Sequence, residues 1–378
     1  MDRRRDWRHW LIGAAVVLAA AAAVAVPAIA DSDWYTLSYK SLSEAPKPLP
    51  IGQVPDDLRV DWSAHGVVPG TGITTTPSTV VTADEDQITG RDPVSGAERW
   101  HYRRGNTTLC SWTMEQNTAI AVFRNGDSCS DITGFNADTG RRRWYLNADL
   151  PRGVRLIPGN GIYYALDSTD VTGFYLEGGS KAWSYHKKGC TPSNAVAGDV
   201  GLVILAECNG RVDLIGVDGY TGKERFDVPA PGGNPRLLSA DTDIVLASDT
   251  GQETDLTLLS ADGRVVGLVA DPHRAGSTRQ PLVPPTVADG RWYGYDGTRV
   301  MAVDLKRPQL LWTASATGSP LLTDDSVLVP TKEGLRRYHL DGTPEGRIPV
   351  SVPPLVDGLE QVGTHLVVRA EDSVTGLG

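Results

Sequence analysis

The sequence lacks the short motifs that mark most enzymes. It contains no Gly-x-Ser-x-Gly elbow, no His-Glu-x-x-His zinc motif and no phosphate-binding loop. Its seven histidines are scattered without the spacing of metal ligands. The acidic groups at residues 84–86 and 241–243 lie between apolar runs, where solvated turns are expected rather than a calcium site. We therefore predict no catalytic, cofactor-binding or metal-binding residues.

Helical periodicity is also absent from most of the chain. Beyond Val60, no stretch keeps the apolar spacing of an α-helix over ten residues, which predicts an all-β domain. Hairpin signatures are present instead, each with two short runs rich in Val, Ile, Leu and Tyr around a polar turn. Eight can be counted: Thr79 to Arg91, Thr118 to Phe135, Gly161 to Phe174, Leu202 to Val217, Asp243 to Leu259, Arg291 to Asp304, Ser326 to Leu340 and His365 to Leu377.

The hairpins are joined by a repeated pattern in which a small residue precedes an aromatic residue by ten positions. The pairs are Gly90 and Trp100, Gly134 and Trp144, Gly173 and Trp183, Gly216 and Phe226, and Ala302 and Trp312. A polar turn with glycine four residues before the ring fills most of these intervals. A period near 40 residues with four strands is the blade of a β-propeller. Each ring buries about 150–250 Å², and the small residue leaves room for a ring from the same or the adjacent blade.

The ends of the chain predict how the ring closes. Seven turn-plus-strand units follow the eight hairpins, because the sequence stops just after Leu377. Leu58 to Ser63 reads as the missing fourth strand, and its Trp62 precedes Trp100 by 38 residues, one period. We predict an eight-bladed β-propeller of four-stranded antiparallel blades over residues 57–378. Its N-terminal strand completes the C-terminal blade and hides two sheet edges.

The turn sequences carry a family resemblance. Asp92 to Trp100 (DPVSGAERW) and Asp218 to Phe226 (DGYTGKERF) resemble the tryptophan-docking motif of pyrroloquinoline-quinone (PQQ) type propeller repeats. The resemblance covers roughly Val60 to the C-terminus. It implies structural docking roles for Trp62, Trp100, Trp144, Trp183, Phe226 and Trp312. Two blades depart from the pattern, with aliphatic residues near Val266 and at Ile348 in place of the ring, and we expect those blades to be the loosest.

The resembling family includes quinoprotein dehydrogenases and non-enzymatic relatives, among them the outer-membrane assembly propeller lipoprotein. The dehydrogenases generally have larger propellers, calcium ligands on long loops and, in many cases, two adjacent cysteines under the cofactor. This sequence has no adjacent cysteines, and the loops between its predicted strands are short. The resemblance therefore favours a non-catalytic propeller without a cofactor.

The N-terminus predicts export. Four arginines among the first eight residues precede twenty uncharged residues, Leu11 to Ala30. This run is long enough to span a bilayer, with its basic end in the cytoplasm. It is also rich in alanine and ends in Ala28-Ile29-Ala30, which fits a signal-peptidase site. Residues 1–30 are therefore either a single membrane anchor or a cleaved signal peptide, and the propeller is either anchored outside the membrane or secreted. No cysteine near the end of the run supports a lipid anchor.

Residues 31–56 contain four prolines and few apolar side chains, which predicts an extended linker between the membrane and the propeller. The four cysteines fit an oxidising compartment. Three pairings are possible, and Cys110 with Cys129 and Cys190 with Cys208 are favoured because each pair lies within one repeat. Metal binding by these cysteines is the weaker alternative.

The charge restricts the partners. Residues 31–378 carry a net charge of −12, which argues against nucleic acid and anionic lipid. The one basic run, residues 141–143, is expected to alternate faces on an outer strand. These observations predict a monomeric scaffold that binds an unknown protein or cell-envelope component on one face of the disc. The alternatives are a small-ligand or cofactor-binding propeller and a PQQ-dependent dehydrogenase.

Overall fold

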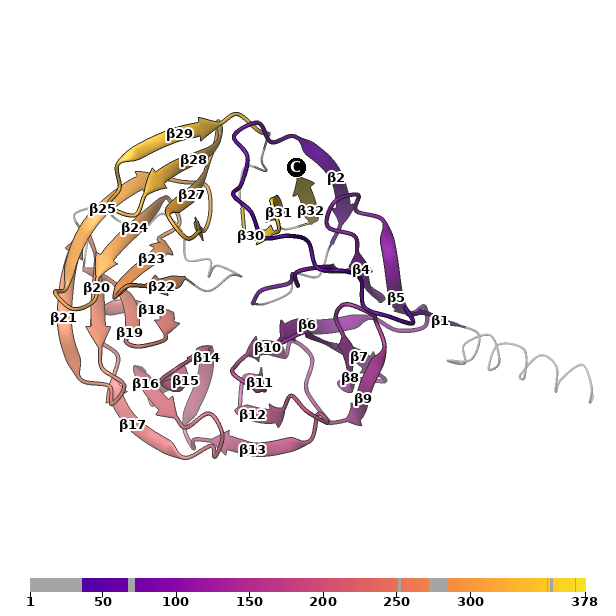
Figure 1. The fold of residues 1–378 in the computed structure, drawn as a ribbon. Coiled ribbons are helices and arrows are strands. Elements are labelled where there is room, and N and C mark those ends of the chain that lie inside the picture. Colours follow the sequence, from indigo (N-terminus) through magenta and orange to yellow (C-terminus); the bar gives the residue numbers. More distant parts are fainter. Residues whose placement is uncertain are drawn as a thin grey trace, which may run out of the picture.

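The structure is a computed structural model that describes residues 36–66, 72–250, 253–271, 285–351, 353, 356–370 and 372–378. The predicted signal or anchor, residues 1–30, lies outside this range. Within the described ranges, no helix has the length and apolar character needed to cross a bilayer. Eight four-stranded antiparallel sheets are arranged in a ring (Figure 1). The predicted all-β, eight-bladed propeller is therefore confirmed.

Blades 2 to 7 each use four consecutive strands, numbered from the axis of the ring outward (Figure 1). Blade 2 has β6 (Leu109–Glu115), β7 (Thr118–Asn125), β8 (Ser128–Asn136) and β9 (Arg142–Asn147); blade 3 has β10 (Arg155–Pro158), β11 (Ile162–Leu166), β12 (Asp170–Tyr175) and β13 (Lys181–His186); blade 4 has β14 (Cys190–Gly198), β15 (Gly201–Cys208), β16 (Arg211–Val217) and β17 (Glu224–Pro229). Blade 5 has β18 (Gly233–Ala240), β19 (Ile244–Thr250), β20 (Glu253–Leu259) and β21 (Val265–Asp271); blade 6 has β22 (Thr286–Ala288), β23 (Arg291–Tyr295), β24 (Arg299–Asp304) and β25 (Gln309–Ser315); blade 7 has β26 (Leu321–Leu322), β27 (Ser326–Thr331), β28 (Gly334–His339) and β29 (Pro344–Ile348).

Blade 8 joins the two ends of the domain. Its inner strands are β30 (Gly358–Val362), β31 (His365–Arg369) and β32 (Ser373–Leu377), and its outer strand is β2 (Val60–His65). β2 pairs antiparallel with β32, with Trp62 opposite Gly376 and His65 opposite Ser373. This pairing uses the backbone groups of both strands that chain ends would otherwise leave at a sheet edge.

Blade 1 is built differently from the sequence-based expectation. It has three strands of its own, β3 (Val80–Ala83), β4 (Gln87–Arg91) and β5 (Glu98–Arg104). Its fourth strand is β1 (Leu37–Lys40), which pairs with the outer edge of β5. The innermost position is taken by an irregular segment that makes one bridge, from Thr75 to Val80. The segment predicted as a linker therefore contributes a strand to the propeller.

The aromatic residues of the repeat hold neighbouring blades together. Trp100 is fully buried and lies opposite Gly90 of its own blade, and its indole N–H donates to the Ala137 carbonyl of blade 2 at 2.8 Å. A Cβ on Gly140 of the blade 2 turn would lie 2.6 Å from the Trp100 ring. Glycine at both positions therefore makes room for one ring. The same donation to the next blade is made by Trp62, Trp144, Trp183 and Trp312.

The register corrects the expectation for the two irregular blades. In blade 5, Gly267 lies opposite Leu258, at the positions where blade 4 has Phe226 opposite Gly216. In blade 7, Gly346 occupies the corresponding place, opposite Arg337. The ring is thus replaced by glycine at both sites, and not by Val266 or Ile348. Sequence spacing failed here because shorter turns shift the alignment of the outer strand by one or two residues.

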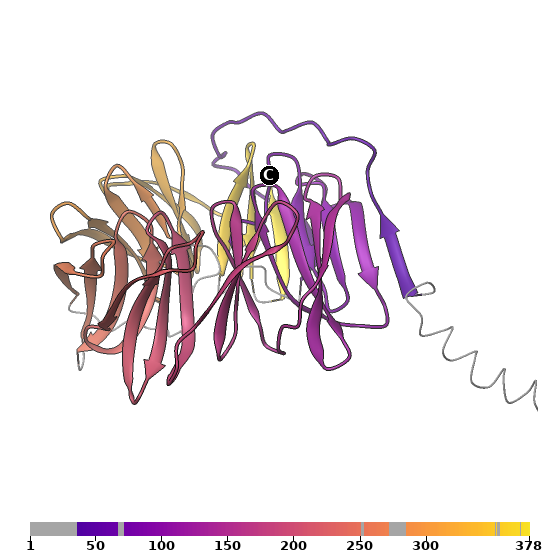
Figure 2. The same cartoon turned by 90° about the horizontal axis from the view of Figure 1, so that it is seen from below.

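Residues 41–56, here called the strap, follow β1 and arch over one face of the disc (Figure 2). We call this the front face; it carries the turns between the first and second strands of the blades. The sequence predicted a linker here, and the structure shows that the strap is packed on the propeller. The Leu49 amide donates to the Pro77 carbonyl at 2.8 Å, and the Gln361 side chain donates to the Gly52 carbonyl at 2.7 Å. Val54 is 5% exposed, in the core of blades 7 and 8.

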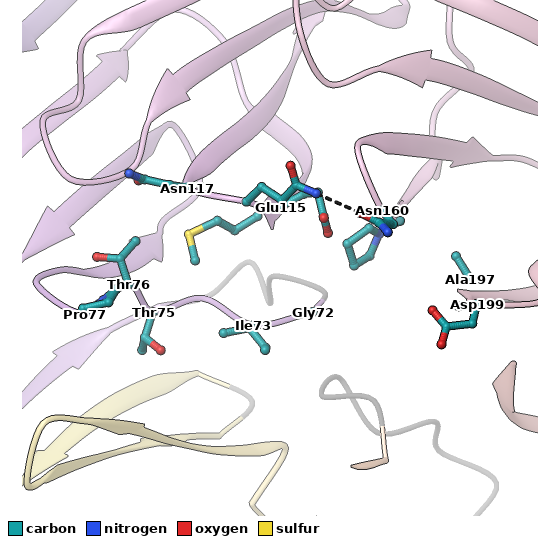
Figure 3. A pocket seen from close by; sticks show the side chains of 15 residues that line it. Gly72, Ile73, Thr75, Thr76, Pro77, Glu115, Asn117, Asn160, Ala197 and Asp199 are labelled. Carbon is teal, nitrogen blue, oxygen red and sulfur yellow. Dashed lines mark hydrogen bonds between the residues drawn. The ribbon is translucent and has the colours of Figure 1, made fainter. Parts of the chain in front are cut away.

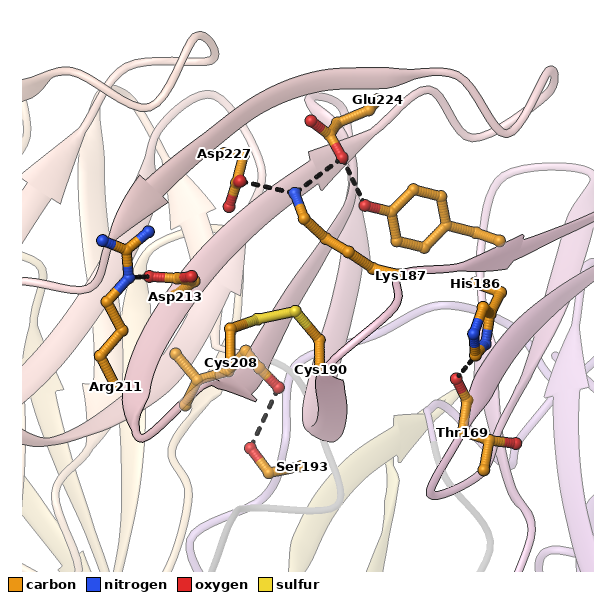
Figure 4. The surroundings of a disulfide bond; sticks show 12 residues. Thr169, His186, Lys187, Cys190, Ser193, Cys208, Arg211, Asp213, Glu224 and Asp227 are labelled. Atoms are coloured by element: carbon orange, nitrogen blue, oxygen red, sulfur yellow. Dashed lines mark hydrogen bonds and ion pairs between the residues drawn. A yellow bond between two sulfur atoms is a disulfide. The ribbon is translucent and has the colours of Figure 1, made fainter.

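Both predicted disulfides are present. Cys110 in β6 is bonded to Cys129 in β8, and Cys190 in β14 is bonded to Cys208 in β15, the residue directly opposite it in the ladder. Figure 4 shows the second bond near an ion pair in which Lys187 contacts Glu224 at 3.1 Å and Asp227 at 2.5 Å. Each disulfide closes a loop of about 20 residues, which contributes on the order of 3 kcal/mol in the chain-entropy model.

Candidate functional site: a cavity at the inner edge of blades 1 to 4

A cavity of about 480 Å³ opens on the front face where the inner ends of four blades meet (Figure 3). Its volume lies in the usual range of ligand sites. Each blade contributes a short segment next to its first turn. The lining residues are Gly72, Ile73, Thr75, Thr76 and Pro77 from blade 1, Met114, Glu115, Gln116 and Asn117 from blade 2, Pro158, Gly159 and Asn160 from blade 3, and Ala197, Gly198 and Asp199 from blade 4.

Local sequence fixes the shape of these turns. Gln116 and Asn117 have φ of 42° and 58°, the left-handed conformation that a two-residue hairpin turn between β6 and β7 requires. The Gln116 amide donates to the Asn160 side-chain oxygen at 2.9 Å, which joins the turns of blades 2 and 3. The Tyr220 hydroxyl of blade 4 donates to the Asn160 backbone carbonyl at 2.5 Å. Three blades are therefore linked through Asn160, and the wall of the cavity is preorganised.

The blade 1 side of the cavity is held by a buried ion pair from blade 8. Glu360 and Arg369 are each 4% exposed and contact each other at 2.9 Å. Glu360 accepts hydrogen bonds from the backbone N–H groups of Thr74 and Thr75 at 2.8 and 3.0 Å. Arg369 donates to the Gly72 carbonyl at 2.8 Å. These contacts replace the strand ladder that blade 1 lacks at its inner edge.

The cavity is acidic. Burial raises the pKa of Glu115 to about 7, although the Gly161 N–H partly opposes this shift. Burial also raises the pKa of Asp241 in the next turn of the ring, with a smaller contribution from the negative charge of Asp199. Among the described residues, none of these three carboxylates forms an ion pair. The two carboxylates that line the cavity, Glu115 and Asp199, thus have no counter-ion from the described part of the chain.

The walls between these carboxylates are largely apolar. Ile73 is 57% exposed, and Met114, Pro77 and Pro158 line the same space. Across the described ranges, no three His, Cys, Asp or Glu side chains are placed to hold a metal ion together. The arrangement suits an amphipathic ligand that has an apolar body and a polar or charged end.

A second cavity, of about 820 Å³, lies beneath the strap at blades 6 to 8. Ile51, Gly52 and Val54 of the strap form one wall, and Asp324, Asp325 and Arg337 lie on the propeller side. The strap therefore covers part of the front face at blades 7, 8 and 1. The first cavity, at blades 1 to 4, is lined by no strap residue.

Comparison with known proteins supports the assignment of the fold. The sequence model of the family described as outer membrane protein assembly factor BamB matches residues 56–195. Among solved structures, BamB from Moraxella catarrhalis is similar, with a TM-score of 0.53 and 15% sequence identity, covering 85% of this chain and 99% of that one. The chain is a β-propeller that resembles BamB, in sequence over residues 56–195 and in fold over most of its length.

Other solved structures are similar to the same degree. The computationally designed Ika8 protein gives a TM-score of 0.56 at 13% identity, covering 83% of this chain and 99% of that one. Sqt1 from Saccharomyces cerevisiae gives 0.57 at 10% identity, with 86% and 99% covered. At these identities the likeness concerns the fold alone. A search of curated protein sequences gives no match.

The docking residues that the sequence predicted lie at the blade junctions and not in the cavity. The acidic run at residues 241–243 lies in the turn between β18 and β19, and residues 84–86 lie between β3 and β4. Glu115, Asp199 and Glu360 were not predicted as site residues. The sequence signal that could have indicated them is a carboxylate directly at the end of a predicted inner strand. The sequence of one repeat, however, does not show which residues of the neighbouring repeats this carboxylate faces.

Proposed function

We propose that this protein is an exported, non-catalytic scaffold that binds a protein or cell-envelope partner on the front face of its propeller. The observation that carries the proposal is the cavity at blades 1 to 4, because it combines apolar walls with unpaired carboxylates on a rigid frame. Rigid frames of this kind bind partners through the residues at one face of the disc. The strap leaves this cavity open while it covers the neighbouring part of the face.

Export is supported by the two disulfides, which persist in oxidising compartments, and by the uncharged run at residues 11–30. The segment is either a membrane anchor or a cleaved signal peptide. An anchored chain would hold blade 1 close to the membrane, because β1 begins at Leu37 and is paired with β5. Mass spectrometry of the N-terminus of the mature protein distinguishes the two forms.

A test of the proposal compares the two faces of the disc by site-specific photo-crosslinking in intact cells. A photoreactive amino acid replaces Asn117 at the cavity or Asp127 in the turn between β7 and β8. We expect a specific crosslinked protein for the position 117 variant and none for the position 127 variant, with the product lost when the unmodified protein is co-expressed in excess. Equal products from both positions would contradict binding on the front face.

A small ligand is the second candidate, because 480 Å³ also suits a metabolite or cofactor. The PQQ-dependent dehydrogenase belongs to this alternative. Calorimetric titration of the full chain with PQQ and calcium, followed by a dye-linked alcohol and sugar oxidation assay, tests it. Saturable binding with turnover above a heat-inactivated control would replace the scaffold by the enzyme.

A further inference from the structure

We propose that the cavity at blades 1 to 4 binds the side chain of a lysine or arginine from a partner protein, with Glu115 as its principal counter-ion. This inference rests on the proposed function and specifies the chemistry of the partner. It follows from three properties of the cavity: its apolar walls, its unpaired carboxylates and its open side.

The first property is the match between the walls and a long basic side chain. Lysine and arginine have an apolar stem and a charged end. Ile73, Met114 and Pro158 offer an apolar surface for the stem, and Glu115 lies beside Met114 at the end of β6. Figure 3 shows the Glu115 side chain between the blade 1 segment and Asn160. A neutral apolar side chain would cover this carboxylate without supplying a counter-ion.

The second property is the charge balance. Burial of Glu115 disfavours its ionised form, and a cation placed beside it in the cavity would restore ionisation. Two more deeply buried carboxylates of the described residues are already paired: Glu360 contacts Arg369, and Asp131 contacts Arg104 at 2.6 Å. At the cavity the described residues supply no cation for the partly buried Glu115, which indicates that the cation comes from outside.

The third property separates a protein partner from a free amine. Glu115 is only partly buried, so a small hydrated cation would gain little from it. A side chain carried by a protein is positioned by contacts around it. The surface beside the cavity offers such contacts in the turns that carry Gln116, Asn160 and Asp199. The open face therefore favours a basic residue presented on a protein loop.

The test uses methionine methyl groups of the full chain as reporters. Of the three methionines, Met114 lines the cavity, Met301 is buried in blade 6 and Met1 is the first residue. The full chain, labelled with ¹³C at the methionine methyls, is titrated with the blocked peptide Gly-Leu-Lys-Leu-Gly. We expect a saturable shift of the Met114 signal and no shift of the Met301 signal. The peptide with glutamine in place of lysine should bind about tenfold more weakly, because it lacks the charge-assisted bond.

Matched variants locate the counter-ion. Glu115→Gln keeps the shape and removes the charge, and should weaken lysine-peptide binding about tenfold. Asp289→Asn makes the same change of charge in the first turn of blade 6, away from the cavity lining, and should leave binding unchanged. The unchanged Met301 signal verifies that both variants are folded.

Four outcomes would overturn the inference: equal affinity of the lysine and glutamine peptides, equal affinity of Glu115→Gln and the unmodified chain, no Met114 shift with either peptide, or binding of butylamine as tight as that of the lysine peptide. The last result would assign the cavity to a free amine. None of these results removes a crosslinked partner at position 117, so the failure of this inference is distinguishable from the failure of the scaffold proposal.

Discussion

Two arcs of the ring differ in how neighbouring blades are packed together. One arc runs from blade 8 through blade 1 to blade 5, and the other runs from blade 5 to blade 8. Between blade 8 and blade 5, passing through blade 1, the strands β2, β5, β9, β13 and β17 each place an aromatic ring against a turn glycine of the next blade: Trp62 with Gly96, Trp100 with Gly140, Trp144 with Gly179, Trp183 with Gly222, and Phe226 with Gly263. Among the described residues of the remaining three junctions, only Trp312 does so, against Gly342. The junctions of blades 5 and 6 and of blades 7 and 8 lack such a ring, and each fills the space between its blades in a different way.

At the junction of blades 5 and 6 the large and small residues have exchanged places. The outer strand has Gly267, and the turn of blade 6 supplies Pro308, which a Cβ on Gly267 would meet at 2.0 Å. Leu258 occupies the position opposite Gly267 where blade 4 has Gly216. The space at the junction is therefore filled from the other side. Close packing requires that the total side-chain volume at a junction be conserved, but either of the two blades can supply the large side chain.

At the junction of blades 7 and 8, blade 8 has no turn between its third and fourth strands against which an aromatic ring of blade 7 could pack. The third and fourth strands of blade 8 come from opposite ends of the domain, so no turn joins them. A Cβ added to Gly346 would meet no described atom within 4 Å. Arg337 instead donates to the Val54 carbonyl at 2.6 Å and contacts Asp56 at 2.8 Å. The strap and this arginine thus add to the apolar core that blades 7 and 8 share.

The largest expected effect breaks a regular junction. Trp100→Ala removes a fully buried ring and its bond to Ala137, and should lower the free energy of unfolding by about 3–5 kcal/mol. Val266→Ala changes a half-exposed side chain on the irregular blade 5 and should cost less than about 0.5 kcal/mol. Urea unfolding of the full chain measures both. Similar losses from the two changes would mean that the rings do not carry the stability of the junctions.

The next effect breaks the contact between the strap and blade 7. Arg337→Ala removes the bonds to Val54 and Asp56 from a side chain that is 15% exposed, and should cost about 1.5–3 kcal/mol. The neighbouring Arg336 is exposed on the same strand, and Arg336→Ala serves as the control with little loss. Hydrogen exchange of β2 should rise in the first variant only. Unchanged exchange there would show that the junction of blades 7 and 8 does not depend on Arg337.

A pair of glycine substitutions sharpens the comparison between the two exceptional junctions. Gly267→Ala places a methyl group against Pro308 and should cost about 1–3 kcal/mol. Gly346→Ala adds the same methyl group in open space and should be neutral or stabilise by up to about 1 kcal/mol, because glycine weakens a strand. Thermal unfolding of both variants decides the matter. The same sign for both changes would contradict the exchanged packing at blade 5.

The smallest effect concerns pH at the cavity. Since burial raises the pKa of Glu115 from 4.5 to about 7, the folded protein holds this proton more tightly than the unfolded chain. The contribution of Glu115 to stability is therefore greatest below pH 4.5, falls as the pH rises to about 7 and stays constant above that. Glu115→Gln should flatten the stability profile in this window. Parallel profiles for the two proteins would show that Glu115 titrates normally.

The eight blades were predictable because the evidence for them is local. A glycine and an aromatic residue ten positions apart lie opposite each other in one hairpin, as Gly134 and Trp144 do. Their spacing in the sequence therefore indicates a contact between residues only ten positions apart. The cysteine pairs are equally local, 19 and 18 residues apart. The positions of Gly267 and Gly346 were not predictable in this way, since a shorter turn changes the register without changing the composition of the strand.

The candidate cavity was not predictable, because its parts come from four blades. Met114, Asn160 and Asp199 each lie at or just beyond the end of an inner strand, and a single repeat does not show that these strand ends converge. The bond between Glu360 and the amides of Thr74 and Thr75 joins residues 286 and 285 positions apart. Such contacts form when the ring closes, and no local sequence pattern predicts them.

The sequence by itself determined the repeat, the number of blades, the disulfide partners and the charge of the domain, because each depends on residues within one blade or on composition. Only the tertiary structure decided that residues 37–40 form a strand of blade 1, that the strap crosses the front face and that Arg337 binds the strap to blade 7. The physical reason is that these contacts form between segments brought together by the curvature of the ring, where packing volume and unpaired backbone groups select the partner from anywhere in the chain.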